Sequence, residues 1–256
     1  MDKYDIFLND LNKHLDLDLH GYKRPQMERR INSLMRTLQI DTYDNFIKRM
    51  REEQLIFNRF LDHLTINVSE FFRNQSQWDV LKEKILPVLL QNNKSIKIWS
   101  AGCSTGEEPY TLAMILEEYC SQGNYSILAT DFDLNVLNKG IEGVYSPKDI
   151  SGIPEDYLKK YIVNQNGSFR VKDNIKKSIT FKKHNLLKDS FDTNFDLILC
   201  RNVVIYFTEE TKSQLYRRFF YSLRTQGVLF TGSTEQIIQA REIGFNSIAI
   251  FFYQKP

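Results

Sequence analysis

The sequence WSAGCSTGEEPYTLA, residues 99–113, lies between an apolar run and a helical segment and decides the fold of the region around it. The run IKIWSAG predicts a strand. The segment EPYTLAMILEEYCSQG predicts a helix with Pro109 in its first turn and Gly123 past its end. Gly102 and Gly106 suit the turn between them. In open α/β sheets, ligands bind at such a turn, outside the carboxyl ends of the strands.

The spacing of the glycines limits the class of ligand that the turn can bind. It is neither the G-x-G-x-x-G of a dinucleotide site nor a phosphate loop with its lysine. A helix N-terminus attracts anions, but Glu107 and Glu108 already occupy that position, so a pyrophosphate would face both carboxylates. A ligand with a positive charge and no phosphate fits better, and S-adenosylmethionine is such a ligand. The alternative is a strand-to-helix corner that uses glycines and binds nothing.

The next predicted strand, YSILATDFD, ends in Asp131 and Asp133. An acidic residue at the end of the second strand can accept hydrogen bonds from two ribose hydroxyls. We assign this role to Asp131 and expect Asp133 to cap the following helix. NAD enzymes share the feature, so it indicates nucleoside binding without selecting the cofactor.

The pattern of the chain changes once. Residues 1–90 predict a helical N-terminal domain and linker, with Met27, Ile31, Leu34, Met35 and Leu38 on one helical stripe. From residue 91 to 256, short apolar runs alternate with helical segments, which predicts an α/β domain with a mainly parallel sheet. The predicted strands after the first are YSILATD, SITFKKHNL, FDLILC and GVLFTG, and FNSIAIFFYQK predicts a closing strand or hairpin.

Composition excludes several classes of protein. The 256 residues are 42% hydrophobic and 26% charged, which is ordinary for a globular chain. The net charge of +2 gives no global field for nucleic acid. Three cysteines without C-x-x-C spacing indicate reduced thiols, and the four histidines show no metal-ligand spacing. We find no signal peptide and no run of the ~20 apolar residues that span a bilayer, and we expect a cytoplasmic protein.

Five segments together carry a resemblance. They are LTINVSEFFRN (64–74), IWSAGCSTGEEPY (98–110), ATDFDLNVL (129–137), NLL (185–187) and CRNVVIYF (200–207). In this order and spacing the chain resembles the CheR family of chemotaxis receptor methyltransferases over nearly its whole length. The resemblance implies a Rossmann-like class I methyltransferase domain with a small antiparallel β-subdomain at about 145–182. It also implies that the helical N-terminal domain recognises the substrate.

The resemblance implies an activity and a set of site residues. The family transfers a methyl group from S-adenosylmethionine to glutamate side chains of membrane chemoreceptors, which gives γ-glutamyl methyl esters and S-adenosylhomocysteine in chemotactic adaptation. Arg73 and Tyr206 are the implied catalytic residues: Arg73 anchors the cofactor carboxylate or steers the incoming one, and Tyr206 lies near the transferred methyl. The implied cofactor contacts are Asn67, Ser69, Arg73, Glu108, Asp131, Asn185, Leu186, Arg201 and Asn202.

Methyl transfer to a carboxylate needs no general base, and the sequence shows no arrangement of residues that would supply one. A glutamate carboxylate has an ordinary pKa of ~4.3, so it is already a nucleophile at neutral pH and needs no general base. No Ser-His-Asp or Cys-His arrangement is visible in the sequence. The enzyme has to hold the carboxylate oxygen in line with the methyl group, and positioning of that kind contributes ~7–11 kcal/mol.

The substrate side is predicted on the N-terminal domain. Residues 21–40 carry five basic side chains against one acidic side chain, Glu28. Arg29 and Arg36 are seven residues apart and share one helical face, opposite the apolar stripe, with Arg30 on its flank. This basic face suits the glutamate-rich helices that the resemblance implies as substrate. The alternative is an ordinary solvated helix face.

Two departures from the family pattern stand out. Residues 232–235 read G-S-T-E where many members have G-H-S-E. Asn166-Gly167 predicts a hairpin in the β-subdomain, but this hairpin is short by several residues. Its length argues against the binding of an extended receptor-tail peptide and favours contact with the receptor body.

Other functions stay open. One is a methyltransferase for nucleic acid or a small molecule, although Asn202 is followed by Val203 and no N-P-P-Y segment is present. Another is a non-catalytic S-adenosylmethionine-binding protein that docks on receptors. A third is an NAD oxidoreductase, which the glycine turn disfavours.

Overall fold

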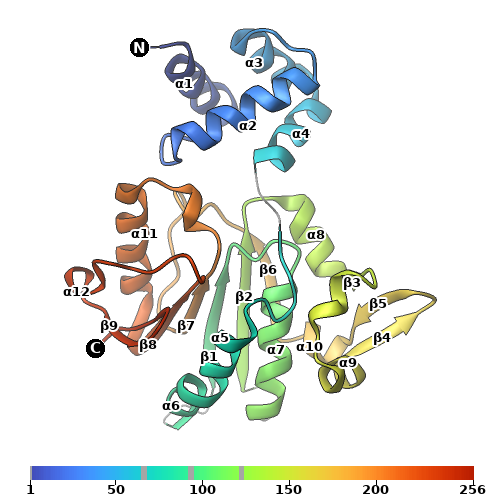
Figure 1. The fold of residues 1–256 in the computed structure, drawn as a ribbon, viewed down its shortest axis with the longest axis vertical. Helices are drawn as coiled ribbons and strands as arrows, with labels where there is room; N and C mark the ends of the chain where they lie inside the picture. The colour runs from blue at the N-terminus through green and yellow to red at the C-terminus, as the bar shows by residue number, and fades with distance from the viewer. Residues whose placement is uncertain (1, 65–67, 92–94, 121–123) are drawn as a thin grey trace. The chain divides into compact units, whose positions relative to one another are not determined.

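The computed structural model describes residues 2–64, 68–91, 95–120 and 124–256, and the chain forms two compact units (Figure 1). The helical unit comprises Met1–Asn67 and the segment Tyr206–Ser213. The α/β unit comprises Val68–Ile205 and Gln214–Pro256. The sequence pattern predicts one helical domain and linker over residues 1–90, whereas the division here falls after residue 67.

The helical unit contains α1 (Lys3–Leu15), α2 (Arg24–Thr37), α3 (Tyr43–Glu52) and α4 (Gln54–Leu64). Side chains cap two of them: Asp2 forms a capping box on α1, and Thr42 accepts from the backbone N–H of Asn45 at the start of α3. Four members of the predicted stripe on α2 are buried, and Leu38, its C-cap, is half-buried. The helical period therefore identifies the packed face of α2.

The segment after residue 74 is helical but packs with the other unit. It consists of α5 (Gln75–Val80), a π-helical turn (Leu81–Ile85) and α6 (Leu86–Gln91). Trp78, Leu81 and Leu86 are at most 1% exposed and belong to the core cluster of the α/β unit. A helical period shows which face of a helix is buried, but not what covers it, so the sequence alone does not assign this segment to either unit.

A seven-stranded sheet forms the centre of the α/β unit (Figure 1). Its strands are β1 (Ile96–Ala101), β2 (Tyr125–Asp131), β6 (Ile179–Lys183), β7 (Phe195–Cys200), β8 (Leu223–Thr231), β9 (Asn246–Ala249) and β10 (Phe252–Gln254). The order is β6-β2-β1-β7-β8-β10-β9, and all pairs from β6 to β8 are parallel, whereas β10 is antiparallel to both neighbours. The predicted strands are confirmed, and the end of the chain is a hairpin.

The chain direction across the sheet reverses between β1 and β7, because β2 and β6 follow β1 to one side whereas β7 and β8 lie on the other. This is the switch point at which α/β sheets bind ligands. A dinucleotide-binding sheet has a mainly parallel order, 3-2-1-4-5-6. The antiparallel β10 between β8 and β9 departs from that order.

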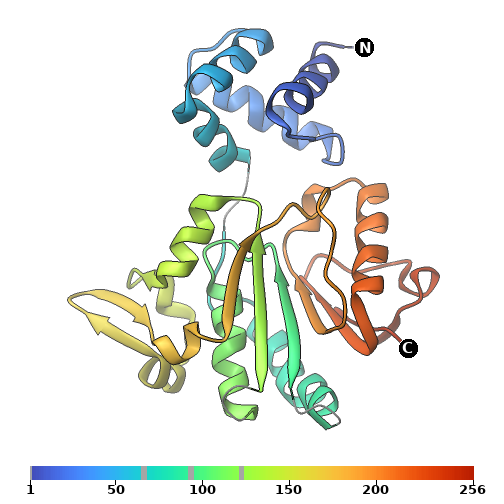
Figure 2. The ribbon, with the colours of Figure 1, turned by 180° about the vertical axis from the view of Figure 1, so that it is seen from behind.

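Helices lie on one face of the sheet in Figure 1, which shows α5 and α7 (Glu107–Tyr119) in front of the strands. Figure 2, seen from behind, shows the strands themselves toward the viewer. Ile98 packs in the core cluster with α7 residues such as Leu112. Trp99, the next residue on β1, points to the other face, because its ring lies 5.4 Å from the rings of both Phe195 and Phe219.

A small antiparallel sheet follows α8 (Leu134–Glu142). Its order is β3 (Val144–Tyr145), β5 (Ser168–Val171) and β4 (Ile162–Gln165). Asn166 and Gly167 join β4 to β5, and both have positive φ, as a type I′ turn requires. The hairpin prediction is confirmed. The insertion predicted at about 145–182 is narrower, because its last strand, β6, pairs with β2 in the main sheet.

The remaining elements connect these layers. They are 3-10 turns at Asp149–Gly152 and Val204–Tyr206, and the helices α9 (Glu155–Tyr161), α10 (Asp173–Lys176), α11 (Glu209–Ser222) and α12 (Ala240–Ile243). Within the described residues, we find no helix with the length and apolar character needed to cross a membrane.

Candidate functional site

The turn after β1 is built on two glycines in left-handed conformations. Gly102 has a φ of +83°, and a Cβ there would overlap the side chain of Val203. Gly106, the N-cap of α7, has a φ of +95°, and its Cβ would lie 3.1 Å from the Gly140 backbone. The backbone N–H groups of Gly102 and Cys103 donate to the Thr130 carbonyl at 2.8 and 2.9 Å. The glycines thus let the turn pack closely between β2, α8 and the loop after β7.

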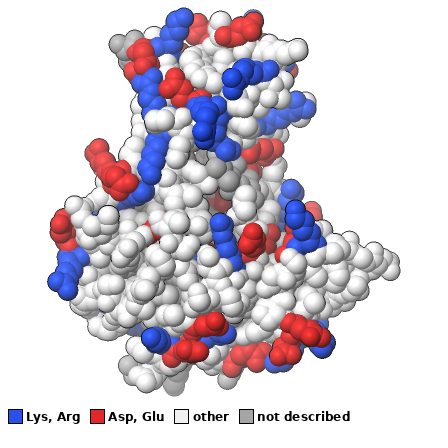
Figure 3. All heavy atoms as spheres, in the orientation of Figure 1, with Lys and Arg blue, Asp and Glu red and all other residues white. Residues whose placement is uncertain are grey.

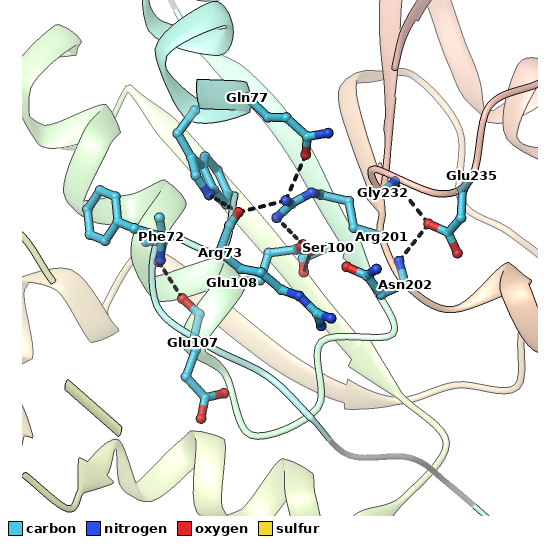
Figure 4. A network of polar contacts seen from close by, with 12 residues as sticks. Phe72, Arg73, Gln77, Ser100, Glu107, Glu108, Arg201, Asn202, Gly232 and Glu235 are labelled. Carbon is cyan, nitrogen blue, oxygen red and sulfur yellow. Dashed lines mark hydrogen bonds and ion pairs between the residues drawn. The ribbon is translucent and has the colours of Figure 1, made fainter. Parts of the chain in front are cut away.

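Glu108, in the first turn of α7, forms a buried ion pair with Arg201, which follows β7 (Figure 4). The carboxylate Oε2 lies 3.3 Å from Nη1 of Arg201, and Oε1 accepts from the Ser100 hydroxyl at 2.9 Å. The side chains are 12% and 2% exposed. Burial raises the pKa of Glu108 and lowers that of Arg201, and the ion pair opposes both shifts.

The Arg201 guanidinium also ties down the chain that carries Arg73. Its Nη2 donates to the Arg73 carbonyl at 2.8 Å and to the Gln77 side chain at 2.9 Å. The group lies over the rings of Trp78 and Phe230, at 5.0 and 4.7 Å. Trp78 donates to the same Arg73 carbonyl at 3.0 Å. The Arg201 side chain therefore connects α7, through Glu108, to the segment that carries Arg73 and Gln77. The sequence does not predict this connection.

The Arg73 segment is held from the other side by α7. Phe72, which precedes Arg73, has a φ of +53°, and its N–H donates to Thr111 at 3.0 Å. The Thr111 hydroxyl in turn donates to the Glu107 carbonyl at 2.8 Å. Burial raises the pKa of the Glu107 carboxyl, and hydrogen bonds from the side chains of Thr105 and Ser69 oppose the shift. Phe72 in a left-handed conformation is strained, and such residues cluster at functional sites.

Asp131 ends β2 beside the glycine turn. Its Oδ2 accepts from the Ser104 N–H at 2.8 Å, and its Oδ1 accepts from the Asp133 N–H at 3.1 Å. Burial raises its pKa, and these backbone donors oppose the shift. Each carboxylate oxygen has two acceptor sites, so Asp131 can still accept from two hydroxyls. Asp133 caps α8 by accepting from the Asn135 N–H at 2.8 Å, which confirms the predicted division of roles in part.

The loop after β6 carries Asn185 and Leu186. The side-chain oxygen of Asn185 accepts from the backbone N–H of Leu187 at 2.9 Å, and the backbone N–H of Asn185 donates to the Asp189 carboxylate at 2.9 Å. The Arg218 guanidinium on α11 donates to the Leu186 carbonyl. These contacts hold the loop in its conformation. The loop lies at the same edge of the sheet as Asp131, because the N–H of His184 donates to the Asp131 carbonyl at 2.9 Å.

Asn67, a predicted cofactor contact, lies outside the described residues. Tyr206 groups with the helical unit, where its carbonyl accepts from the Lys23 N–H at 2.9 Å and its neighbour Phe207 pairs with Tyr22. Ser233, at the position where many family members have histidine, is exposed.

The basic side chains of α2 divide into three kinds. Arg24 forms ion pairs with Asp2, Asp5 and Glu28, so it is neutralised within the helical unit. Arg30 is half-buried and donates to the His63 carbonyl at the end of α4, and burial lowers its pKa. Arg29 and Arg36 are exposed. Figure 3 shows basic side chains interspersed with acidic ones on the visible surface of this unit.

Several residues of the site were missed in the sequence. They are Gln77, Trp78, Ser100, Ser104, Thr111 and Glu235. Ser100 offered a signal, because it is a polar residue that directly follows the apolar pair Ile98-Trp99 and lies two residues before Gly102. For Gln77 and Thr111 no signal existed, because ordinary polar residues on a helix are indistinguishable from solvated ones.

This arrangement suits a nucleoside ligand that also carries positive charge. Asp131 offers acceptors at the end of the second strand, and Glu108 supplies a carboxylate at the glycine turn. A pyrophosphate would meet these carboxylates at close range. The site therefore fits S-adenosylmethionine, whose sulfonium and amino groups are positive.

Comparisons with known proteins agree over both units. Residues 2–65 match the family described as "CheR methyltransferase, all-alpha domain", and residues 67–250 match "CheR methyltransferase, SAM binding domain". Chemotaxis protein methyltransferases of Listeria monocytogenes and Listeria innocua are 40% and 39% identical, each covering 98% of this chain and 97% of the relative. One from Borreliella burgdorferi is 38% identical, covering 86% of this chain and 83% of the relative.

Proposed function

This chain belongs to the CheR methyltransferase family, and we propose that it methylates glutamate side chains of chemoreceptors in the cytoplasm. Membership makes it an S-adenosylmethionine-dependent methyltransferase of chemotaxis. The observation that carries the proposal is the pair of carboxylates, Glu108 and Asp131, that flank a glycine turn at the switch point of the sheet. They favour a cationic nucleoside over a dinucleotide.

Particular residues would hold the cofactor. Asp131 offers acceptors for the ribose hydroxyls, and Glu108 offers a carboxylate for the amino group. Arg73 would bind the cofactor's own carboxylate or steer the incoming one. Ser69, Asn67, Asn185, Leu186 and Asn202 stay predicted contacts. Arg201, by contrast, would act through Glu108 and the Arg73 carbonyl, because its side chain is 2% exposed.

The reaction makes few chemical demands on the protein. The cofactor supplies an electrophilic methyl group on a sulfonium sulfur. The substrate glutamate is ionised at neutral pH, with a pKa of ~4.3, so no residue has to remove a proton. The protein has to orient the substrate oxygen and exclude water, and we assign the orientation to Tyr206 and Arg73.

The product is expected to be a methyl ester. Incubation with tritium-labelled S-adenosylmethionine and a receptor fragment should give a labelled fragment that releases volatile methanol in mild alkali, because esters hydrolyse there and N-methyl groups do not. A receptor fragment whose glutamates are all glutamine is the control and should stay unlabelled. Label that survives alkali would contradict the carboxylate mechanism. Cofactor binding without any transfer would instead favour a docking protein.

The exposed arginines of α2 are expected to recognise an acidic receptor helix. Arg29→Glu together with Arg36→Glu should raise the KM for receptor roughly tenfold or more, because like charges then face each other at the encounter. The rise of KM with added salt should flatten or reverse, since salt then screens a repulsion where it screened an attraction. Exposed charges contribute under ~1 kcal/mol each to stability, so the fold and the cofactor affinity should persist.

A matched variant separates recognition from general charge. Lys48→Glu with Arg51→Glu makes the same charge change on exposed positions of α3 in the same unit. It should raise KM less than the α2 pair. Equal effects of the two variants would mean that only net charge matters, and an unchanged KM in the α2 pair would make this face ordinary solvated surface.

A further inference from the structure

A buried carboxylate after β8 has no role in the reaction described so far. Glu235 is 4% exposed, and backbone N–H groups surround it (Figure 4). Its Oε2 accepts from the N–H of Asn202 at 2.6 Å and from that of Gly232 at 2.9 Å, and its Oε1 accepts from Ile205 at 3.3 Å. One side chain thus links the loops that follow the neighbouring strands β7 and β8.

The close approach of these loops has a structural requirement. A Cβ at Gly232 would overlap the Glu235 carboxylate and would lie 2.8 Å from the Asn202 nitrogen. Asn202 itself has a φ of +60°, a left-handed conformation that costs energy for a residue with a side chain. The hydrogen bond to Glu235 is made by the N–H of this strained residue. The carboxylate therefore stabilises a backbone conformation that the Asn202 residue would not favour alone.

The loop that Glu235 holds, residues 201–203, contacts the glycine turn after β1. Val203 follows Asn202, and its side chain occupies the space where a Cβ at Gly102 would lie. Arg201 precedes Asn202 and forms the ion pair with Glu108. Residues 201–203 thus connect the Glu235 carboxylate to both sides of the turn after β1.

The charge of Glu235 matters for this contact. Burial raises its pKa, and the backbone N–H groups oppose that shift, as expected for a carboxylate held by several donors. Bonds from N–H groups to an ionised acceptor are roughly twice as strong as neutral ones. An amide in its place would put an NH₂ donor against an N–H donor on at least one side.

We propose that Glu235 is a positioning residue of the methyltransferase: its carboxylate fixes the 201–205 loop so that Asn202 faces the cofactor. This inference rests on the proposed function, in which Asn202 lines the cofactor pocket. Glu235 itself does not touch the cofactor in this account and acts through the backbone of Asn202 and Ile205.

The test is calorimetric binding of S-adenosylhomocysteine to the full chain. Glu235→Gln should weaken binding roughly tenfold or more, because a charge-assisted hydrogen bond is lost from the loop. It should raise the KM for S-adenosylmethionine by a similar factor and leave the KM for receptor unchanged. Glu242→Gln, which makes the same change at an exposed position on α12, is the control and should bind like wild type.

The outcomes separate this inference from the proposed function. If wild type binds no S-adenosylhomocysteine, the proposed cofactor site is wrong. If wild type binds and Glu235→Gln binds equally well, the positioning role is wrong, even where the variant is less stable. Equal weakening in Glu242→Gln would also overturn it. If Glu235→Gln does not fold, Glu235→Asp is tested in its place, because it keeps the charge but shortens the side chain by one methylene. A wild-type affinity for S-adenosylhomocysteine in Glu235→Asp would overturn the positioning role.

Discussion

Replacement of Arg201 by methionine is expected to lower the free energy of unfolding of the α/β unit by about 3–5 kcal/mol. The substitution keeps an apolar stem but leaves Glu108 as a buried carboxylate without its cation, and removing one partner of a buried ion pair is costly by this amount. It also removes the donors to the Arg73 carbonyl and to Gln77. Binding of S-adenosylhomocysteine should weaken as well, because the Arg73 segment loses its anchor.

Urea unfolding followed by tryptophan fluorescence measures this effect in the right part of the chain. Trp78 and Trp99 are the two tryptophans of the sequence, and both are buried in the α/β unit. The control is the double variant Arg201→Met with Glu108→Gln, which should regain part of the loss, because the remaining amide can bond to Ser100 without a charge. A single Arg201→Met variant as stable as wild type would show that the pair contributes nothing.

The parts of the structure that the sequence predicts are those governed by local rules. The strands have apolar runs, the α2 stripe has a helical period, and Asp133 precedes a helix start, so each is predictable from its neighbours in the chain. The Asn166-Gly167 turn is predicted by the positive φ that both residues adopt readily. The position of Asp131 at the end of the second strand follows from the same reasoning.

The role of Arg201 could not be predicted in this way. Its partners Glu108, Arg73 and Gln77 lie 93–128 residues away in the sequence, and only the folded sheet brings them together. The family resemblance implies a cofactor contact for Arg201, whereas its side chain is 2% exposed and pairs with Glu108. The same limit applies to Glu235, whose partners are backbone groups that no sequence pattern marks.

The Asp131→Ala variant is expected to bind S-adenosylmethionine and S-adenosylhomocysteine roughly ten- to a hundredfold more weakly. Hydrogen bonds to a charged acceptor contribute about 1.5–3 kcal/mol, and 1.4 kcal/mol corresponds to a factor of ten. Calorimetry on both ligands measures the change. Asp131→Asn, which keeps one acceptor oxygen, should bind both ligands with an affinity between those of wild type and Asp131→Ala.

Weaker binding alone would not show that Asp131 contacts the ribose, because Asp131 also accepts from the Ser104 N–H and so holds the glycine turn. The two roles respond differently to the ligand. If Asp131 binds the ribose, wild type should discriminate against the 2′-deoxy analogue of S-adenosylhomocysteine, and Asp131→Ala should lose most of that discrimination, as a double-mutant cycle requires of interacting partners. If Asp131 acts only through Ser104, the substitution should weaken both ligands by the same factor, and the ribose assignment would be wrong.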